Sequence, residues 1–280
     1  MRNIREVIQL STEFLEKKGV AHARREAEEL LAALLNRKRL ELYFDYDAPI
    51  KERELTKYRE WIRRKGEKEP LDYIIGNKTF HQLKLKVSPD VLIPRHETEV
   101  LVEKILKRLS DEPKTVWDLC TGSGCIGLSI KQARPQDSVT LSDLSPEALA
   151  IAKENAAINR IDVSFLEGDL LLPFEGQKAD VVVCNPPYVL EEEYSQLEEE
   201  VRHYEPRMAL VGGLQFYERL ARDLPTHLNP GAQVFFEIGK GQGEQILKLF
   251  DKSHWKQKSY EKDWSENDRF FFLEFEGKID

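Results

Sequence analysis

The chain has 280 residues, of which 41% are apolar and 33% are charged, and its formal net charge is −8 at pH 7. This length and composition predict one large or two modest globular domains, each able to bury a core. No apolar run approaches the roughly 18 residues that a membrane-spanning helix needs, so we expect no membrane span. Arg2, Arg5 and Glu6 stand where a secretory signal would be apolar, which predicts a cytoplasmic protein.

Cysteine usage points to a reducing compartment. Cys120, Cys125 and Cys184 are odd in number, lie in or beside apolar segments and form no Cys-x-x-Cys pair. This pattern argues against a disulfide framework and against a zinc site. We therefore expect three reduced core or turn residues and no metal.

Charge divides the chain into two parts. Residues 1–70 hold 17 Lys and Arg against 14 Asp and Glu, which leaves 25 against 36 for the remainder. A duplex-binding enzyme normally shows a basic surface, because phosphate contacts supply much of its affinity. The acidic remainder fits a basic protein partner better.

Residues 1–70 predict a separate helical module. Apolar residues recur at helical spacing in three stretches, which is the pattern of a bundle core. Gly19 is typical of the position just past the end of a helix, and the cations at 63–65 would favour the dipole at the end of another. The three predicted helices run from Ile4 to Gly19, from Ala23 to Asn36 and over about 51–65.

Residues 71–94 are predicted to link this module to the rest of the chain. Lys78 to Val91 shows the mostly alternating apolar pattern of a β-hairpin. A helix is predicted from Arg95 to about Leu109. On the residues alone, its polar start up to Glu99 indicates a first-turn cap.

A strand, a Gly-rich turn and a helix are predicted next, with the strand over 115–119 and the turn from Cys120 to Gly127. Gly122 and Gly124 let the backbone approach a ligand closely, and the helix start places free N–H groups beside it. The first small position of the usual pattern is Cys120 and not glycine. That departure weakens a phosphate-binding interpretation and leaves a nucleoside-binding turn.

Two further strand ends carry candidate ligand contacts. A strand over 139–143 ends in Asp143, whose carboxylate could accept bonds from both ribose hydroxyls, each worth about 1.5–3 kcal/mol. Asp143 could equally cap the helix predicted over 146–158, because Ser145-Pro146-Glu147 is a good N-cap sequence. A strand over 164–168 ends at Asp169-Leu170, where either an adenine ring or only a solvated loop would lie.

Asn185-Pro186-Pro187-Tyr188 directly follows the apolar run Val181 to Cys184. Two prolines fix φ and lack N–H donors, so the Asn185 amide oxygen and the Pro186 carbonyl can face one substrate nitrogen. Two acceptors would orient a weakly nucleophilic amide nitrogen and stabilise the charge that develops on it, while Tyr188 packs against the substrate plane. These four residues alone also fit a simple turn that leaves a strand.

These strand ends are predicted to share one cleft, because ligands of an open parallel sheet sit outside the carboxyl ends of its strands. A Rossmann dehydrogenase is the competing interpretation. Its phosphate fingerprint is incomplete here, and the Asn185–Tyr188 segment offers no hydride chemistry. The C-terminal part completes the sheet with strands over 233–238 and 269–275 and a helix over 241–250, and we assign no catalytic role to Glu237 or Gln242.

Taken together, these motifs resemble the HemK/PrmC family of protein-(glutamine-N5) methyltransferases, which are class I S-adenosylmethionine-dependent enzymes. The block from Leu92 to Glu99 is the most specific, since nucleic-acid amino-methyltransferases with the same Asn-Pro-Pro-Tyr segment generally lack it. The other blocks are Pro70 to Gly76, Phe80, Asp118 to Gly124, Asp143 to Pro146 with Ala148-Leu149, Asn185 to Tyr188, and Glu205 to Leu210 with Gly212-Gly213.

The resemblance implies an α/β fold with a Rossmann-like, seven-stranded, mostly parallel sheet whose last strand is antiparallel. It also implies a small N-terminal helical bundle and a linking β-hairpin. The expected domains are a substrate-recognition domain over 1–70, the hairpin over 71–94 and the methyltransferase domain over 95–280.

The implied function is methylation of the side-chain amide nitrogen (N5) of the glutamine in the Gly-Gly-Gln motif of class I peptide chain release factors, with S-adenosyl-L-methionine as cofactor. We expect a monomer without a direct nucleic-acid substrate. An amino-methyltransferase that acts on DNA adenine or rRNA guanine is one alternative, although no basic target-recognition insert separates the motifs. A non-catalytic binding module is another.

The resemblance also assigns residues. The glutamine amide would be held by Asn185, Pro186, Pro187 and Tyr188, with Asn185, Pro186 and Tyr188 as the catalytic set, and the segment near Arg95 would shape the cleft. Two positions depart from the family: Cys120 replaces a glycine, which should spare cofactor binding, and His96 replaces a proline, with an effect that stays open. Cofactor contacts are implied for Cys120, Thr121, Gly122, Ser123, Gly124, Asp143, Asp169, Leu170 and Asn185.

Overall fold

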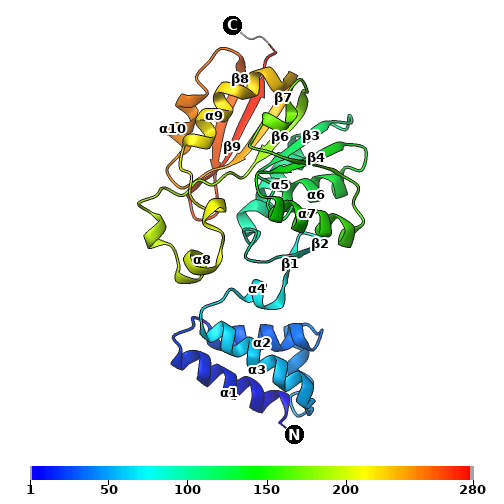
Figure 1. Cartoon of the computed structure of the whole chain (residues 1–280), viewed down its shortest axis with the longest axis vertical. Coiled ribbons are helices and arrows are strands. Elements are labelled where there is room, and N and C mark those ends of the chain that lie inside the picture. Colours follow the sequence, from blue (N-terminus) through cyan, green and yellow to red (C-terminus); the bar gives the residue numbers. More distant parts are fainter. Residues whose placement is uncertain (1, 278–280) are drawn as a thin grey trace. The chain divides into compact units, whose positions relative to one another are not determined.

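A seven-stranded sheet forms the centre of the larger of two units in the computed structural model, which describes residues 2–277 (Figure 1). The smaller unit comprises the chain up to Asn77 together with Glu198–Tyr204, and the larger comprises Lys78–Leu197 and the chain from Glu205 onward. Residue 1 and residues 278–280, which the predicted domains include at their ends, lie outside the described residues.

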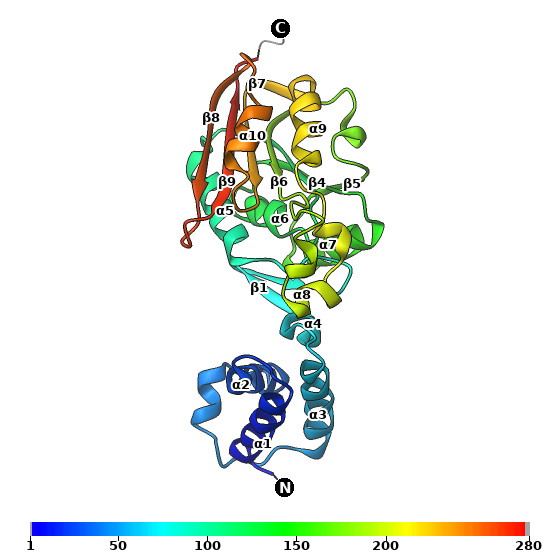
Figure 2. The ribbon, with the colours of Figure 1, turned by 90° about the vertical axis from the view of Figure 1, so that its left-hand side faces the viewer.

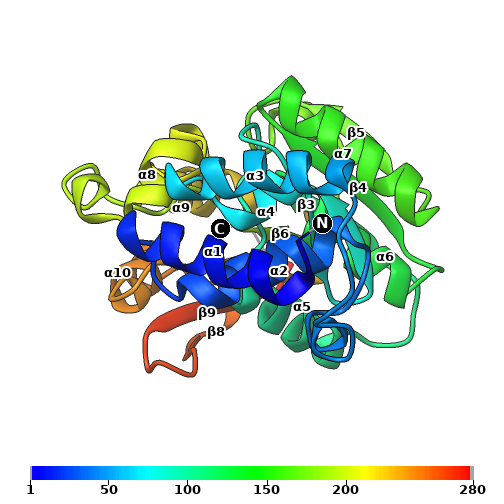
Figure 3. The ribbon, with the colours of Figure 1, turned by 90° about the horizontal axis from the view of Figure 1, so that it is seen from below.

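The three longest helices of the smaller unit form a bundle, and Figure 3 shows them side by side. Their apolar faces bury one core, as the helical spacing predicted. A capping box begins the first helix: Asn3 Oδ1 accepts from the Glu6 N–H at 2.9 Å, and Glu6 accepts from the Asn3 N–H. Gly19, with φ 68°, follows its end. The elements are α1 (Ile4–Lys17), α2 (Ala23–Leu34), η1 (Arg39–Tyr43), α3 (Glu52–Gly66), α4 (Leu71–Ile75) and α8 (Glu199–Tyr204).

Lys65 joins α8 to this bundle. Only 4% of Lys65 is exposed, and its Nζ lies 3.0 Å from Glu200 Oε2 and 3.4 Å from Glu26 Oε2. The Tyr204 hydroxyl adds a bond of 2.7 Å to the Glu67 carbonyl. The cation expected to favour the helix dipole at the end of α3 therefore also forms a partly buried ion pair with Glu200, 135 positions further along the sequence.

The sheet of the larger unit has the strand order β5-β4-β3-β6-β7-β9-β8. The first five strands in this order are parallel, whereas β9 runs antiparallel between β7 and β8. The predicted seven-stranded sheet with an antiparallel last strand is thus confirmed. The strands are β3 (Thr115–Leu119), β4 (Ser138–Asp143), β5 (Ser164–Glu167), β6 (Ala179–Cys184), β7 (Leu228–Glu237), β8 (Trp255–Lys262) and β9 (Asp268–Phe275).

Helices cover both faces of this sheet, so its central strands are apolar on both sides (Figure 2). Along β6, Val181 and Val183 enter one core, while Val182 and Cys184 enter the other. One face carries α5 (His96–Arg108), α6 (Cys125–Ala133) and α7 (Pro146–Asn159), and the other carries α9 (Gln215–Asp223) and α10 (Gly243–Leu249). Short 3-10 turns lie at η2 (Leu172–Phe174), η3 (Tyr194–Gln196), η4 (Arg207–Ala209) and η5 (Leu224–His227).

The predicted hairpin consists of β1 (Asn77–Phe80) and β2 (Leu83–Lys86). Asn155 of α7, which is fully buried, bonds both the N–H and the carbonyl of Lys86, at 2.6 and 3.0 Å. The same side chain donates to the Ser123 carbonyl at 2.9 Å. The hairpin is therefore fixed to α7 and to the turn after β3. Among the described residues, no helix is long and apolar enough to cross a bilayer.

Candidate active site

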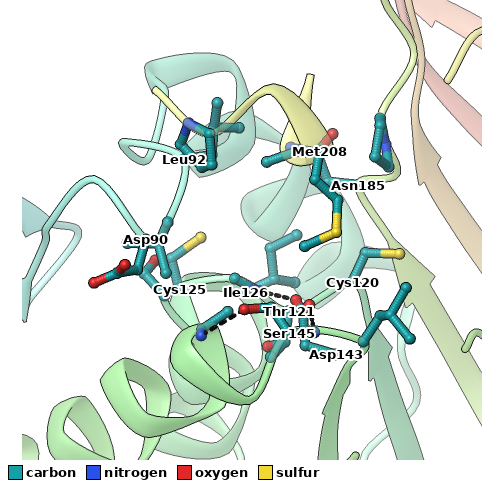
Figure 4. A pocket seen from close by; sticks show the side chains of 18 of the residues that line it. Asp90, Leu92, Cys120, Thr121, Cys125, Ile126, Asp143, Ser145, Asn185 and Met208 are labelled. Atoms are coloured by element: carbon teal, nitrogen blue, oxygen red, sulfur yellow. Dashed lines mark hydrogen bonds between the residues drawn. The ribbon is translucent and has the colours of Figure 1, made fainter. Parts of the chain in front are cut away.

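One pocket of the larger unit lies at the carboxyl ends of the parallel strands (Figure 4). Leu119 of β3 pairs with Ser142 of β4 and with Cys184 of β6, so these strands end together. Figure 4 shows Leu92 and Met208 across the pocket from Asp143 and Ser145. Of the predicted site residues, the pocket is lined by Cys120, Thr121, Gly122, Ser123, Asp143, Asp169, Leu170, Asn185 and Pro187; Gly124, Pro186 and Tyr188 are not part of its lining.

The turn after β3 needs left-handed backbone at three positions, Cys120 (φ 54°), Gly122 (φ 54°) and Gly124 (φ 83°). A β-carbon at Gly122 would meet no heavy atom within 4 Å, so this part of the turn leaves open space beside the pocket. Gly124 caps α6 and packs against the core instead. Cys120 adopts a conformation that glycine accepts without cost, which explains in physical terms why a glycine fits this position.

Asp118 supports the turn from below. Its Oδ2 accepts the Thr121 hydroxyl at 2.6 Å and the Gly127 N–H at 2.8 Å. Only 1% of Asp118 is exposed, and its Oδ1 has no hydrogen-bond partner among the described residues. Burial raises the pKa of this carboxyl to about 7, against the lowering effect of the two donors.

Asp143 closes the pocket beside that turn. Its Oδ2 accepts the Gly122 N–H at 2.8 Å and its Oδ1 accepts the Ser145 N–H at 3.0 Å. The N-cap of α7 is Ser145, whose hydroxyl accepts from the Ala148 N–H at 3.1 Å, so Asp143 is not itself the cap. Burial raises the pKa of the Asp143 carboxyl, and the backbone donors oppose this. Its remaining lone pairs are free to accept hydroxyl groups.

The end of β5 adds one polar and one apolar wall. Asp169 lines the pocket and forms an ion pair with Arg219 at 2.7 Å. Leu170 is buried with φ 52°, and it lines the pocket together with Ile126 and Ala148. Apolar side chains of this kind suit a flat aromatic ring.

The Asn185–Tyr188 segment lies at the end of β6. Asn185 is half-buried and lines the pocket, and its side chain makes no hydrogen bond within residues 2–277. Tyr188 turns its hydroxyl towards Glu237 Oε1, at 3.3 Å, and towards Arg269. The residue packed against this segment must lack a side chain, because a β-carbon at Gly212 would overlap the Pro187 carbonyl oxygen. Asn185 is thus the residue of this segment that presents an unused amide to the pocket.

Two segments of the pocket wall were not predicted as site residues. Asp90 to Pro94 precede α5, and Pro206 to Ala209 include η4. Glu205 ties them together: its Oε1 lies 2.5 Å from Arg95 Nη2, and its Oε2 accepts the Ile93 N–H at 3.1 Å. From Leu92 onward the first segment falls in a sequence block that carried the family resemblance, as does the whole second segment, and that was the available signal.

The cap interpretation of residues 95–99 is wrong in its detail. Arg95 is the N-cap of α5 but makes no side-chain cap bond. Thr98 lines the pocket and donates to Glu237 Oε2 at 2.6 Å, and Glu99 accepts the His81 N–H at 2.8 Å. His96 is exposed and does not line the pocket, so its replacement of the family proline leaves the wall intact.

These features fit a nucleoside ligand. Open space beside Gly122, acceptors on Asp143 and an apolar wall at Leu170 match a backbone contact, a ribose and an adenine ring. The described residues contain no group of three or more His, Cys, Asp or Glu side chains that could hold a metal ion.

The chain matches known protein families along most of its length. A model of the PrmC N-terminal domain matches residues 6–76, and a model of the methyltransferase small domain matches residues 96–210. A release factor glutamine methyltransferase of Chlamydia trachomatis serovar D is 42% identical over 279 residues, which cover 97% of this chain and 94% of that protein. The chain belongs to the release factor glutamine methyltransferase family.

Further relatives and one solved structure are consistent with this membership. Release factor glutamine methyltransferases of Geobacter sulfurreducens and Leptospira interrogans are 40% and 38% identical and cover 89% and 95% of the chain, and 89% and 96% of those proteins. A methyltransferase structure from Pyrococcus furiosus, 19% identical, superimposes with a TM-score of 0.52 over 72% of this chain and 92% of that one, which supports the fold alone. The family membership confirms the resemblance that the sequence blocks carried.

Proposed function

We propose that this chain transfers the methyl group of S-adenosyl-L-methionine to the side-chain amide nitrogen of the glutamine in the Gly-Gly-Gln motif of class I peptide chain release factors. One observation carries the proposal: in a chain of this family, the unpaired amide of Asn185 lines the same pocket as Asp143 and Gly122. As parts of the same proposal, the enzyme acts in the cytoplasm, as a monomer, without a nucleic-acid substrate.

The cofactor would be held by residues of three strand ends. Asp143 accepts from the ribose hydroxyls, the backbone of Cys120 to Ser123 contacts the amino-acid part, and Leu170 covers the adenine. When bound, S-adenosyl-L-methionine supplies a methyl group made electrophilic by its sulfonium. The Gly122 N–H keeps Asp143 in place at 2.8 Å, so the ribose contacts exist before the cofactor arrives.

The Asn185–Tyr188 segment would orient the glutamine. The Asn185 amide oxygen and the Pro186 carbonyl would accept hydrogen bonds from the two N–H groups of the substrate amide. These bonds would turn its nitrogen towards the methyl group and stabilise the positive charge that develops there. No base is needed before the transfer. Attack by the neutral amide nitrogen gives an N-methylated cation, which is acidic enough to lose its extra proton to water afterwards. Tyr188 packs beside the amide from the end of the segment.

The smaller unit is proposed to recognise the release factor. It exposes an apolar patch on and after η1, which we define as Leu40, Tyr43 and Phe44. These side chains are 67%, 40% and 86% exposed. Exposed aromatic side chains of this kind are common anchors of protein interfaces. The acidic Glu191 to Glu193 and Glu198 to Glu200 suit a basic partner that itself binds RNA.

A single assay tests this function. The enzyme is incubated with methyl-labelled S-adenosylmethionine and, separately, with a release factor, tRNA, rRNA or DNA. We expect label only in the release factor, with mass spectrometry placing one methyl group on the glutamine of the Gly-Gly-Gln peptide. A Gln→Ala release factor serves as the negative control. Transfer to nucleic acid alone would select the base methyltransferase, and transfer to no acceptor would select the binding module.

A further inference from the structure

Glu237 ends β7 as a buried carboxylate that bridges two elements beside the pocket. Only 1% of Glu237 is exposed. Its Oε2 accepts the Thr98 hydroxyl of α5 at 2.6 Å, and its Oε1 accepts the Tyr188 hydroxyl at 3.3 Å. Thr98 lines the pocket, and Tyr188 follows Pro187, which also lines it. One side chain thus holds both the wall on α5 and the end of the Asn185–Tyr188 segment.

Two further side chains, Gln242 and Arg269, also hold Tyr188. Gln242 donates to the Tyr188 carbonyl at 2.9 Å, and its own amide oxygen accepts the Gly239 N–H at 2.9 Å. Arg269 of β9 donates to the Tyr188 hydroxyl at 3.3 Å and to the Ile238 carbonyl at 3.1 Å. Its guanidinium carbon lies 5.8 Å from the centre of the Tyr188 ring.

Burying a carboxylate to this extent costs free energy of folding unless its oxygens accept hydrogen bonds. An apolar residue would fill the end of β7 at lower cost if packing were its only task. The carboxyl group at this position is therefore best explained by the geometry that it imposes on the Thr98 and Tyr188 hydroxyl groups, which both donate to it.

We propose that Glu237 is a positioning residue of the methyl transfer: it fixes the Tyr188 hydroxyl and thereby the placement of Asn185 against the glutamine amide. This inference rests on the proposed function and adds a residue to it. Asn185 lies three positions before Tyr188, on a segment whose two prolines make it stiff, so a shift of the phenol is passed to the amide. A displacement of about 1 Å at a reacting group can cost ~10²-fold in rate.

A double-mutant cycle tests the coupling. Glu237→Gln keeps the shape but presents an NH2 group to one of the two hydroxyls, and Tyr188→Phe removes one of them. Each single variant should lower kcat about tenfold while the dissociation constant for S-adenosylhomocysteine changes less than twofold. The double variant should be no slower than the worse single variant, because both changes break the same bond. Multiplying effects would overturn the proposal.

A matched control separates positioning from folding. Asp137 is an equally buried carboxylate that binds Arg134 at 2.6 Å and the Lys114 N–H at 3.1 Å, before the amino ends of β3 and β4. Asp137→Asn should lower the melting temperature but keep kcat per folded molecule. An equal loss of kcat in Asp137→Asn and Glu237→Gln would show that Glu237 only stabilises the fold.

A second measurement needs no methyl acceptor. In NMR spectra of the free full-length enzyme labelled at tyrosine Cζ, the Tyr188 signal is identified by its loss in Tyr188→Phe. It should move in Glu237→Gln and stay in place in Asp137→Asn. An unmoved signal would overturn the inference whatever the enzyme methylates. A wild-type enzyme that leaves the release factor unmodified would instead overturn the proposed function, with this spectrum still deciding the role of Glu237.

Discussion

The N–H of Gly122 donates to Oδ2 of Asp143 across 2.8 Å, so the turn after β3 and the end of β4 form one continuous surface. Ser145 donates to the other oxygen of the same carboxylate. A ligand that contacts Asp143 is thereby placed beside the open space at Gly122. The two neighbouring strand ends act as a single pre-formed half of the pocket.

Asp143→Ala should weaken cofactor binding by about 10- to 100-fold, because hydrogen bonds to a charged acceptor contribute roughly 1.5–3 kcal/mol. Isothermal titration calorimetry with S-adenosylhomocysteine measures the change. Asp180→Ala is the matched control: Asp180 also accepts a backbone N–H, that of Thr115 at 2.8 Å, but at the amino end of β6. A variant that binds as tightly as the wild type would remove Asp143 from the cofactor site.

Asn185→Ala should keep cofactor affinity within about tenfold and lose ~10²–10³ in kcat, since one group that stabilises the transition state through a hydrogen bond contributes about that much. Steady-state methylation of a release factor, with calorimetry on the same preparations, separates the two effects. Asn229→Ala is the control, because Asn229 donates to Asp180 at the start of β7 and should leave turnover unchanged. Normal turnover of the Asn185 variant would contradict the proposed mechanism.

Local sequence signals were enough for six of the seven strands of the sheet and for half of the pocket. Apolar runs marked β3, β4 and β6, and the glycines and Asp143 marked their ends, because these features depend on neighbouring residues. The edge strand β8 escaped prediction since it is mostly exposed and polar, and its strand form depends on pairing with β9. For the same reason, residues 198–204 could not be assigned to the bundle from local pattern.

The long-range part of the site could not be predicted. Glu205 and Arg95 are 110 positions apart, and Thr98 and Glu237 are 139 apart. No local pattern shows that these side chains meet, and a buried glutamate in an apolar strand end looks the same whether it holds a partner or only terminates the strand. Only the folded structure distinguishes the two cases.

The stability of the enzyme should fall as pH rises from about 4 to about 7, in part because of Asp118. Burial raises the pKa of this carboxyl from 3.8 to about 7. The folded state therefore holds a proton that the unfolded state has lost, so the contribution is full below pH 4 and disappears as pH passes 7. Asp118→Asn keeps an acceptor for Thr121 and Gly127. Between pH 5 and pH 8, its free energy of unfolding should fall less than that of the wild type, by an amount on the order of a few kcal/mol.

Urea denaturation of both proteins at the two pH values measures this difference. Asp180→Asn is the control, because Asp180 is only half-buried and its carboxylate is already satisfied by Thr115 and Asn229. Parallel pH profiles for the wild type and Asp118→Asn would show that the Asp118 carboxyl is not protonated in the folded state at pH 5.

Phe44→Ser should raise the KM for an intact release factor about tenfold and leave S-adenosylhomocysteine binding unchanged, because Phe44 is 86% exposed and the most exposed member of the apolar patch. Trp264→Ser is the matched control: Trp264 is 89% exposed but belongs to the larger unit. Surface changes of this kind alter stability by about 0.5 kcal/mol or less, so both variants should melt like the wild type. Equal KM values for the wild type and Phe44→Ser would place recognition elsewhere. A raised KM in both variants would indicate a general effect of exposed aromatic residues on association, and not a specific docking surface on the bundle.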